Sequence, residues 1–117
     1  MGVSEPLIQT SLLGEAIEHA PVAVFVTDEL GNYVAVNQAA CVLLGYERDE
    51  LLKLRVIDVA RYAAALGEWS EMRTTGTQVG TSSLTCNDGS VVDFTYAAGA
   101  TTVAGMPVFV SVGAAKH

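Results

Sequence analysis

The chain has 117 residues, half of them hydrophobic and only 16% charged, which argues against disorder and allows one domain with a single core. Its formal charge of −7 disfavours nucleic acid and anionic membranes as direct partners, because both select basic surfaces. The longest apolar runs, 20–26 and 107–112, fall far short of the roughly 20 residues that span a bilayer, and no signal peptide is visible. We therefore expect a cytoplasmic domain without membrane contact.

Residues 4–20 carry apolar side chains at helical spacing, which predicts an amphipathic helix that is stopped by Pro21. This helix has to bury its apolar stripe, either on the rest of the chain or against the same helix of a second subunit, and the sequence leaves both open. In the second case we expect a dimer interface made by Leu12, Leu13, Ala16, Ile17 and, from the last strand, Val110.

The stretch 22–46 predicts a strand, a tight turn, a returning strand and a helix. β-Branched and aromatic residues favour strands at 22–27 and 33–36, and Gly31 with Asn32 suits the turn between them. Asn37 is a good N-cap for a helix over 38–44, and Gly45 is a natural residue to end it.

Helical segments follow, and strands come last. The expected elements are short helical turns at 47–52 and 55–60, a longer helix over 62–74, and strands at 78–86, 90–98 and 107–112. Asn87-Asp88-Gly89 predicts a hairpin between the first two of these strands, and a second turn is expected at 103–105. Helices grouped between a leading hairpin and trailing strands predict an α+β fold, with one antiparallel sheet and helices on one face.

The residue types form no catalytic or metal-binding constellation, so we expect neither enzyme activity nor a metal site. Asp28 and Asp58 have no histidine, serine nucleophile or metal partner at a matching spacing, and turn and cap roles account for them. Cys41 and Cys86 are isolated cysteines, which we interpret as buried free thiols.

In their order and spacing these features resemble a PAS domain. The resemblance rests on the strand ending Val26-Thr27-Asp28, the turn Leu30-Gly31-Asn32, the strand running into Asn37, the Gly45-Tyr46 helix end with its Glu-Arg-Asp-Glu-Leu-Leu continuation, and the Asn87-Asp88-Gly89 hairpin. It covers nearly the whole chain, from Ala20 to about Val112. It divides the chain into an N-terminal cap or dimerisation helix at 1–20 and a PAS core at 21–115.

The resemblance implies a five-stranded antiparallel sheet of order 2-1-5-4-3, with helices that enclose an interior pocket for a cofactor or small ligand. It also implies a homodimer and a signal passed to an effector of the parent protein: a histidine kinase of a two-component system, a cyclase, a phosphatase or a transcription regulator. Members of the family often close with an Asp-Ile-Thr-like exit. The ending Val112 to His117 lacks this motif, so the sequence does not indicate the output.

Side-chain alternation along the strands, combined with the helices, predicts the lining of this pocket. The predicted ligand-binding residues are Phe25, Thr27, Val36, Leu43, Ile57, Leu66, Trp69, Phe94, Tyr96, Phe109 and Ser111. The set is largely apolar, with Thr27, Tyr96 and Ser111 as its polar groups, which suits a small apolar or amphipathic molecule. The same side chains could instead fill one another's space as a ligand-free core, and the module would then serve dimerisation or protein interaction.

No cofactor is firmly implied. A histidine-ligated haem needs an axial imidazole from the central helices, but the only histidines are His19 and His117. An FMN photosensor of the LOV type needs a reactive cysteine near 55–60, where none is present, and Ser111 stands where a flavin-contacting glutamine is expected. Non-covalent FAD stays open because Trp69 could line a flavin ring, although no glycine-rich phosphate loop supports a nucleotide.

Overall fold

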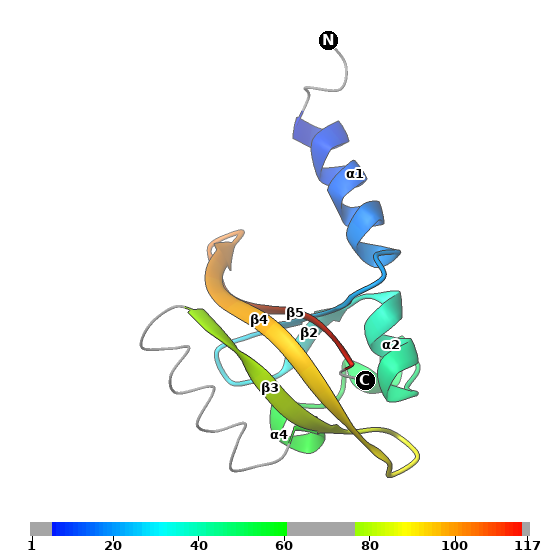
Figure 1. The fold of residues 1–117 in the computed structure, drawn as a ribbon. Coiled ribbons are helices and arrows are strands. Elements are labelled where there is room, and N and C mark those ends of the chain that lie inside the picture. Colours follow the sequence, from blue (N-terminus) through cyan, green and yellow to red (C-terminus); the bar gives the residue numbers. More distant parts are fainter. Residues whose placement is uncertain (1–5, 61–76, 116–117) are drawn as a thin grey trace.

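The computed structural model describes residues 6–60 and 77–115. Their helices are α1 (Pro6–Glu18), α2 (Gln38–Leu44), α3 (Arg48–Leu51) and α4 (Val56–Val59), and their strands are β1 (Ala23–Thr27), β2 (Tyr33–Val36), β3 (Thr77–Thr85), β4 (Val91–Val103) and β5 (Met106–Ala115). The strands form one antiparallel sheet of order β2-β1-β5-β4-β3 (Figure 1). The predicted fold class and strand order are therefore confirmed. The helix expected at 62–74 lies outside the described residues.

The core lies between one face of the sheet, called here the inner face, and the helices α2, α3 and α4. Each of these helices contributes buried apolar residues to it, such as Leu44, Leu51 and Val59, which are at most 1% exposed. In contrast, α1 projects away from the sheet (Figure 1). The domain thus consists of a packed sheet-and-helix body with one protruding helix.

β1 and β2 are joined by the expected turn, but their pairing contains a β-bulge. Val26 lies opposite Ala35 and Thr27 lies opposite Tyr33, so Val34 is an additional residue in β2. Because of this extra residue, Tyr33 and Val36 both face the core, whereas Val34 is 40% exposed. An unbroken two-residue alternation along β2 would instead have placed Val34 on the same face as Val36.

β4 and β5 are longer than predicted. Residues 99–106 were expected to connect two strands, but the strands pair through them to a tight turn at Ala104-Gly105, where Val103 lies opposite Met106. At its other end β5 continues beyond Val112 to Ala115. Glycine and alanine are poor strand formers by themselves, so here cross-strand pairing outweighs local preference.

Candidate functional site

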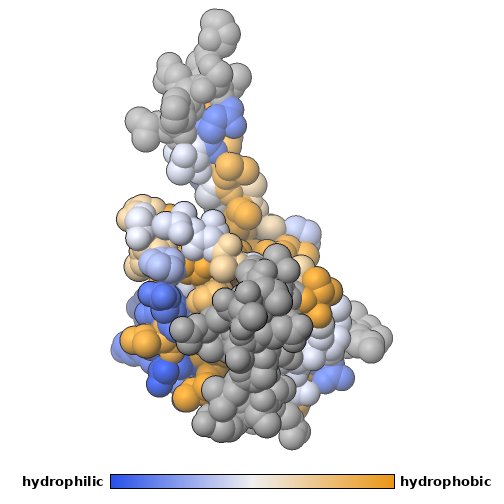
Figure 2. Space-filling model, turned by 90° about the vertical axis from the view of Figure 1, so that its left-hand side faces the viewer, coloured by the Kyte–Doolittle hydropathy of each residue, from blue (hydrophilic) through white to orange (hydrophobic). Residues whose placement is uncertain are grey.

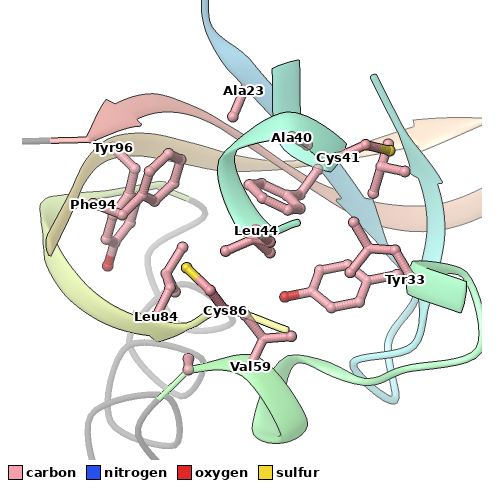
Figure 3. Packing of buried hydrophobic residues seen from close by; sticks show 14 residues of the cluster. Ala23, Tyr33, Ala40, Cys41, Leu44, Val59, Leu84, Cys86, Phe94 and Tyr96 are labelled. Atoms are coloured by element: carbon pink, nitrogen blue, oxygen red, sulfur yellow. The ribbon is translucent and has the colours of Figure 1, made fainter. Parts of the chain in front are cut away.

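The candidate site is the inner face of the sheet together with the helices packed on it (Figure 3). The structure places most of the predicted pocket residues there. Phe25, Val36, Phe94 and Tyr96 belong to the core cluster, Leu43 packs against it, Thr27 and Phe109 are buried, and Ser111 is partly buried opposite Phe25. In the view of Figure 3, Leu44 of α2 lies between Tyr33 on one side and Phe94 with Tyr96 on the other.

Aromatic rings from three strands contact one another on the inner face. Phe25 packs on Tyr33 with ring centroids 5.5 Å apart and meets Phe94 edge-on at 5.6 Å, and Phe94 stacks on Tyr96 at 6.0 Å. The strand β5 lies between β1 and β4, and near Phe25 and Phe94 it contributes the small residues Ser111 and Gly113. A Cβ atom on Gly113 would lie 2.9 Å from Cζ of Phe94. The missing side chain therefore allows rings from β1 and β4 to meet above β5.

One predicted pocket residue, Ile57, lies away from this set. Ile57 is 38% exposed because the single turn of α4 directs Val59 into the core, and its neighbour Ile57 points away. Leu66 and Trp69 lie outside the described residues. The ligand-binding roles of the remaining residues stay predictions.

Other inward-facing residues escaped sequence reasoning. Tyr33 was missed because of the β-bulge, and Leu51 and Val59 because they lie on single helical turns, where the apolar pattern is too short to identify a buried face. Ser82, Leu84 and Cys86 alternate along the last residues of β3 and the position after it, and all three are buried. Alternation counted from Cys86 backwards would have revealed them.

The interior is electrically neutral within the described part of the chain. Its buried polar side chains are those of Thr27, Asn37 and Ser82, none of which carries a charge. Burial raises the pKa of the Tyr33 hydroxyl well above its ordinary value of 10, and the nearby carboxylate of Asp58 adds to the effect, so this phenol stays protonated. Such an environment favours uncharged molecules.

The predicted free thiols are confirmed, since Cys41 and Cys86 are both buried and unpaired. Burial raises the pKa of the Cys41 thiol, which favours its protonated form. Among the described residues, no group of histidine, cysteine and carboxylate side chains is arranged to hold a metal ion.

Asn37 joins the interior to α1. Its Oδ1 atom accepts hydrogen bonds from the main-chain nitrogens of Ala40 (3.1 Å) and Val24 (2.9 Å), so that it caps α2 as predicted and also holds β1. Its Nδ2 atom donates to the main-chain oxygens of Ile17 (2.7 Å) and Val22 (2.9 Å). One side chain, 3% exposed, therefore links the last turn of α1 with β1 and α2.

Arg48 makes a second connection to α1. Its guanidinium donates to the carboxylate of Glu18 at 2.5 Å and, through Nε, to the main-chain oxygen of Val36 at 3.3 Å. Val36 is part of the core, and Glu18 is the last residue of α1. The guanidinium of Arg48 thus bonds to both the end of β2 and the end of α1.

Four of the five residues predicted for a dimer interface are exposed, and the fifth, Val110, is partly buried. Leu12, Leu13 and Ile17 of α1 are 54%, 64% and 45% exposed, and Ala16 is exposed as well. Leu13 and Ile17 line a groove of about 440 Å³ against the outer face of the sheet, together with Val24, Val26 and Ala35. Val110 lies opposite Val26 on that same face. Figure 2 shows hydrophobic surface where α1 joins the rest of the chain. Within the described ranges, the apolar residues Leu12, Leu13 and Ile17 of the helix therefore stay exposed.

Asp28 and Asp58 have the structural roles expected for them. The carboxylate of Asp28 accepts hydrogen bonds from the main-chain nitrogens of Leu30 and Asn32 and so shapes the β1–β2 turn. Asp58 accepts from the main-chain nitrogen of Arg55 at the start of α4. None of the described helices has the length and apolar character needed to cross a bilayer.

Comparison with known proteins agrees with this architecture. A family model described as "PAS domain" matches residues 11–76. The fold is similar to that of a PAS domain from a two-component sensor histidine kinase, with a TM-score of 0.85 at 18% identity, covering 96% of this chain and 100% of that one. It is also similar to the PAS domain of an HTR-like protein from Haloarcula marismortui, with a TM-score of 0.81 at 20% identity and 92% of each chain covered.

A third similar structure is the PAS-B domain of Cycle from Drosophila melanogaster with bound ethylene glycol. Its TM-score is 0.71 at 12% identity, and the match covers 80% of this chain and 99% of that one. At such low identities the solved structures establish a shared fold. No curated protein matches the sequence.

Proposed function

Since the chain belongs to the PAS domain family, we propose that it is a sensory input module, not an enzyme, that binds a small apolar or amphipathic molecule in its interior and relays occupancy to an effector domain. The observation that carries this proposal is the hydrogen-bond network of Asn37, which ties the elements around the interior to α1. The proposed effector is a histidine kinase, a cyclase, a phosphatase or a transcription regulator. Similarity to a PAS domain from a sensor histidine kinase supports the first of these.

The chemistry of the inner face supports the choice of ligand. The side chains that face the core are mostly aromatic and aliphatic, and the buried polar ones are uncharged. A buried ion would therefore lack a counter-charge among the described residues. A solved PAS-B domain of similar fold has ethylene glycol bound, which supports the proposal of a small neutral ligand. The proposed ligand is therefore small and uncharged.

The connections to α1 support the relay. A ligand against the inner face would displace Phe25 or Val36, which face each other in β1 and β2. The carbonyl of Val36 bonds to Arg48, which pairs with Glu18, and the adjacent residue Asn37 bonds to Ile17. A shift in β2 would thus reach α1 over one or two hydrogen bonds. If the ligand binds more tightly to the conformation with one of two α1 positions, its binding shifts the equilibrium toward that position.

A thermal-shift screen of small neutral molecules, followed by hydrogen exchange, tests this proposal. We expect at least one compound to raise the unfolding temperature and to change amide exchange at His19 and Ala20, whose nitrogens bond to α1. Glu18→Gln should weaken the change at α1, whereas Glu15→Gln, a matched change on the same helix, should retain it. If nothing in the screen stabilises the protein, the binding role fails. If binding leaves α1 unchanged, the relay fails.

A second candidate function is a ligand-free module for homodimerisation or protein interaction. The exposed apolar residues Leu12, Leu13 and Ile17 favour it, because a helix with such a surface is expected to find a partner. We expect a dimer in sedimentation analysis that dissociates in the double variant Leu13→Glu, Ile17→Glu and persists in the control Ser11→Glu. A wild-type protein that sediments as a monomer would contradict it.

A further inference from the structure

One buried hydroxyl on the inner face has no hydrogen-bond partner in the part of the chain that the structure describes. The side chain of Ser82 in β3 is 6% exposed, and its Oγ atom has no hydrogen-bond partner among the described residues. Burying a hydroxyl without a partner costs free energy, and buried polar groups in native proteins are nearly always bonded to protein, water or ligand. A hydroxyl in this position is therefore a ready contact for a molecule bound in the interior.

The register of the sheet shows where this hydroxyl points. Ser82 lies opposite Phe94, and directly opposed residues of antiparallel strands share a face. Phe94 belongs to the core, as does Leu84, two residues further along β3. Ser83 has the reverse orientation, since it lies opposite Asp93 and its Oγ atom approaches that carboxylate at 3.4 Å. Ser82 therefore faces the interior, and its neighbour Ser83 faces away from it.

The surroundings of Ser82 restrict the chemistry of its partner. Phe94 stacks on Tyr96, which provides an aromatic surface next to the hydroxyl. Gly80, opposite Tyr96, contributes no side chain to this part of β3. The buried polar side chains of the described residues are uncharged, so a carboxylate or ammonium group would be buried without a counter-charge.

We propose that Ser82 determines the specificity of the interior site, and that the ligand is a small neutral molecule whose hydroxyl or carbonyl group bonds to Ser82 Oγ while its apolar or aromatic body packs on Phe94. This inference rests on the proposed sensory function. It adds a requirement that a purely apolar interior does not impose: a hydrocarbon of the same shape would leave the hydroxyl of Ser82 unpaired and bind more weakly.

Replacement of Ser82 by alanine separates this role from a structural one. In the free protein Ser82→Ala removes an unpaired buried group, so the unfolding temperature should stay equal or rise. In the complex it removes a hydrogen bond, so affinity should fall. A serine that merely supports the fold would give the reverse pattern, with a lower unfolding temperature and unchanged affinity.

Titration of the domain with phenol, toluene and benzoate, followed by amide chemical shifts in NMR, tests the proposal. We expect phenol to shift the amides of Ser82 and Phe94. Ser82→Ala should weaken phenol binding about tenfold and leave toluene binding within about twofold, because only phenol can bond to the hydroxyl. The control Ser83→Ala should leave both affinities within about twofold. Benzoate should bind more weakly than phenol because its charge is buried unpaired.

Equal phenol binding in the wild type and in Ser82→Ala overturns this inference, and so does benzoate binding more tightly than phenol. If phenol and toluene shift interior amides with no dependence on Ser82, the sensory function stands and only the role of Ser82 fails. If no probe shifts any interior amide and the thermal-shift screen is also negative, the sensory function fails together with it.

Discussion

The side-chain amide of Asn37 donates a 2.7 Å hydrogen bond to the main-chain oxygen of Ile17, 20 residues earlier in the chain. The residue that begins α2 therefore also holds the end of α1. Its side-chain oxygen Oδ1 accepts two hydrogen bonds, from the main-chain nitrogens of Val24 and Ala40. α1 projects from the body and exposes apolar residues, and this junction and the ion pair of Arg48 with Glu18 connect it to the core.

Replacing Asn37 with alanine should destabilise the domain by about 2–4 kcal/mol, because it removes a helix cap and leaves buried main-chain groups without partners. Urea unfolding measures the loss. Gln38→Ala, an exposed neighbour, should change stability by less than about 0.5 kcal/mol. An Asn37→Ala protein as stable as the Gln38→Ala control would show that the network contributes nothing.

Asn37→Asp distinguishes the two sides of the junction. Aspartate retains an acceptor for Val24 and Ala40 but cannot donate to Ile17, whose carbonyl it would face with a negative charge. We expect the α2 amides to keep their protection in hydrogen exchange and the last turn of α1 to exchange faster. Equal protection of α1 in both proteins would mean that the Ile17 bond does not hold the helix.

Two glycine substitutions should act in opposite directions. A Cβ atom on Gly113 would lie 2.1 Å from the main-chain oxygen of Thr95 and 2.8 Å from Cα of Tyr96, so Gly113→Ala should destabilise the protein by about 1–3 kcal/mol or more. Gly14 in α1 has nothing within 4 Å of such an atom, so Gly14→Ala should stabilise by about 0.5–1 kcal/mol through its helix preference. Thermal unfolding of both variants measures these changes. An unfolding temperature of Gly113→Ala equal to that of the wild type would contradict the close packing above β5.

The β4–β5 turn contains a correctable strain. Ala104 has φ of 51° and Gly105 has φ of 79°, a left-handed pair in which the alanine carries a steric cost that asparagine tolerates better. Ala104→Asn should raise stability by about 0.5–1 kcal/mol, measured by urea unfolding. The control Thr102→Asn, in the adjacent strand, should give no gain. A loss of stability in Ala104→Asn would count against this turn geometry.

Stability should fall at alkaline pH because of Tyr33. Burial, together with Asp58, holds the pKa of this tyrosine above its ordinary value of 10 in the folded state, whereas the unfolded chain ionises near 10. The contribution of the buried, protonated Tyr33 to the free energy of unfolding is therefore fully present below pH 10. It is lost as the pH rises above 10, because the tyrosine of the unfolded chain releases its proton first. Unfolding in urea at about pH 8 and about pH 11 should show a smaller decline for Tyr33→Phe than for the wild type. The same decline in both proteins would contradict the burial of this hydroxyl.

The sheet order was implied by the resemblance to PAS domains, whereas local patterns were enough to predict the α2 cap and its glycine end and several residues of the inner face. These features depend on two-residue alternation and on residues with strong backbone preferences, such as Asn37 and Gly45, which has φ of 76°. They are visible in a short stretch of sequence because the physical cause acts within that stretch.

Features that depend on partners distant in the chain were missed. The bulge at Val34 arises from pairing with β1, and the length of β4 and β5 arises from pairing between residues, such as Ala100, that have little strand preference of their own. The cap at Asn37 was foreseen, but its bonds to Ile17 and Val22 were not, because they require the relative position of α1. Ile57 was misplaced because the rotation of a single helical turn is set by what packs on it.

Native mass spectrometry of the purified domain is the most direct test of an occupied interior. A sensory module with the proposed ligand should show a native mass above that of the polypeptide by one small neutral organic molecule, which is lost on denaturation, and Ser82→Ala should reduce the occupied fraction. A native mass equal to that of the polypeptide, together with a thermal-shift screen in which no small molecule stabilises the protein, would contradict ligand sensing and leave the ligand-free dimerisation module as the function.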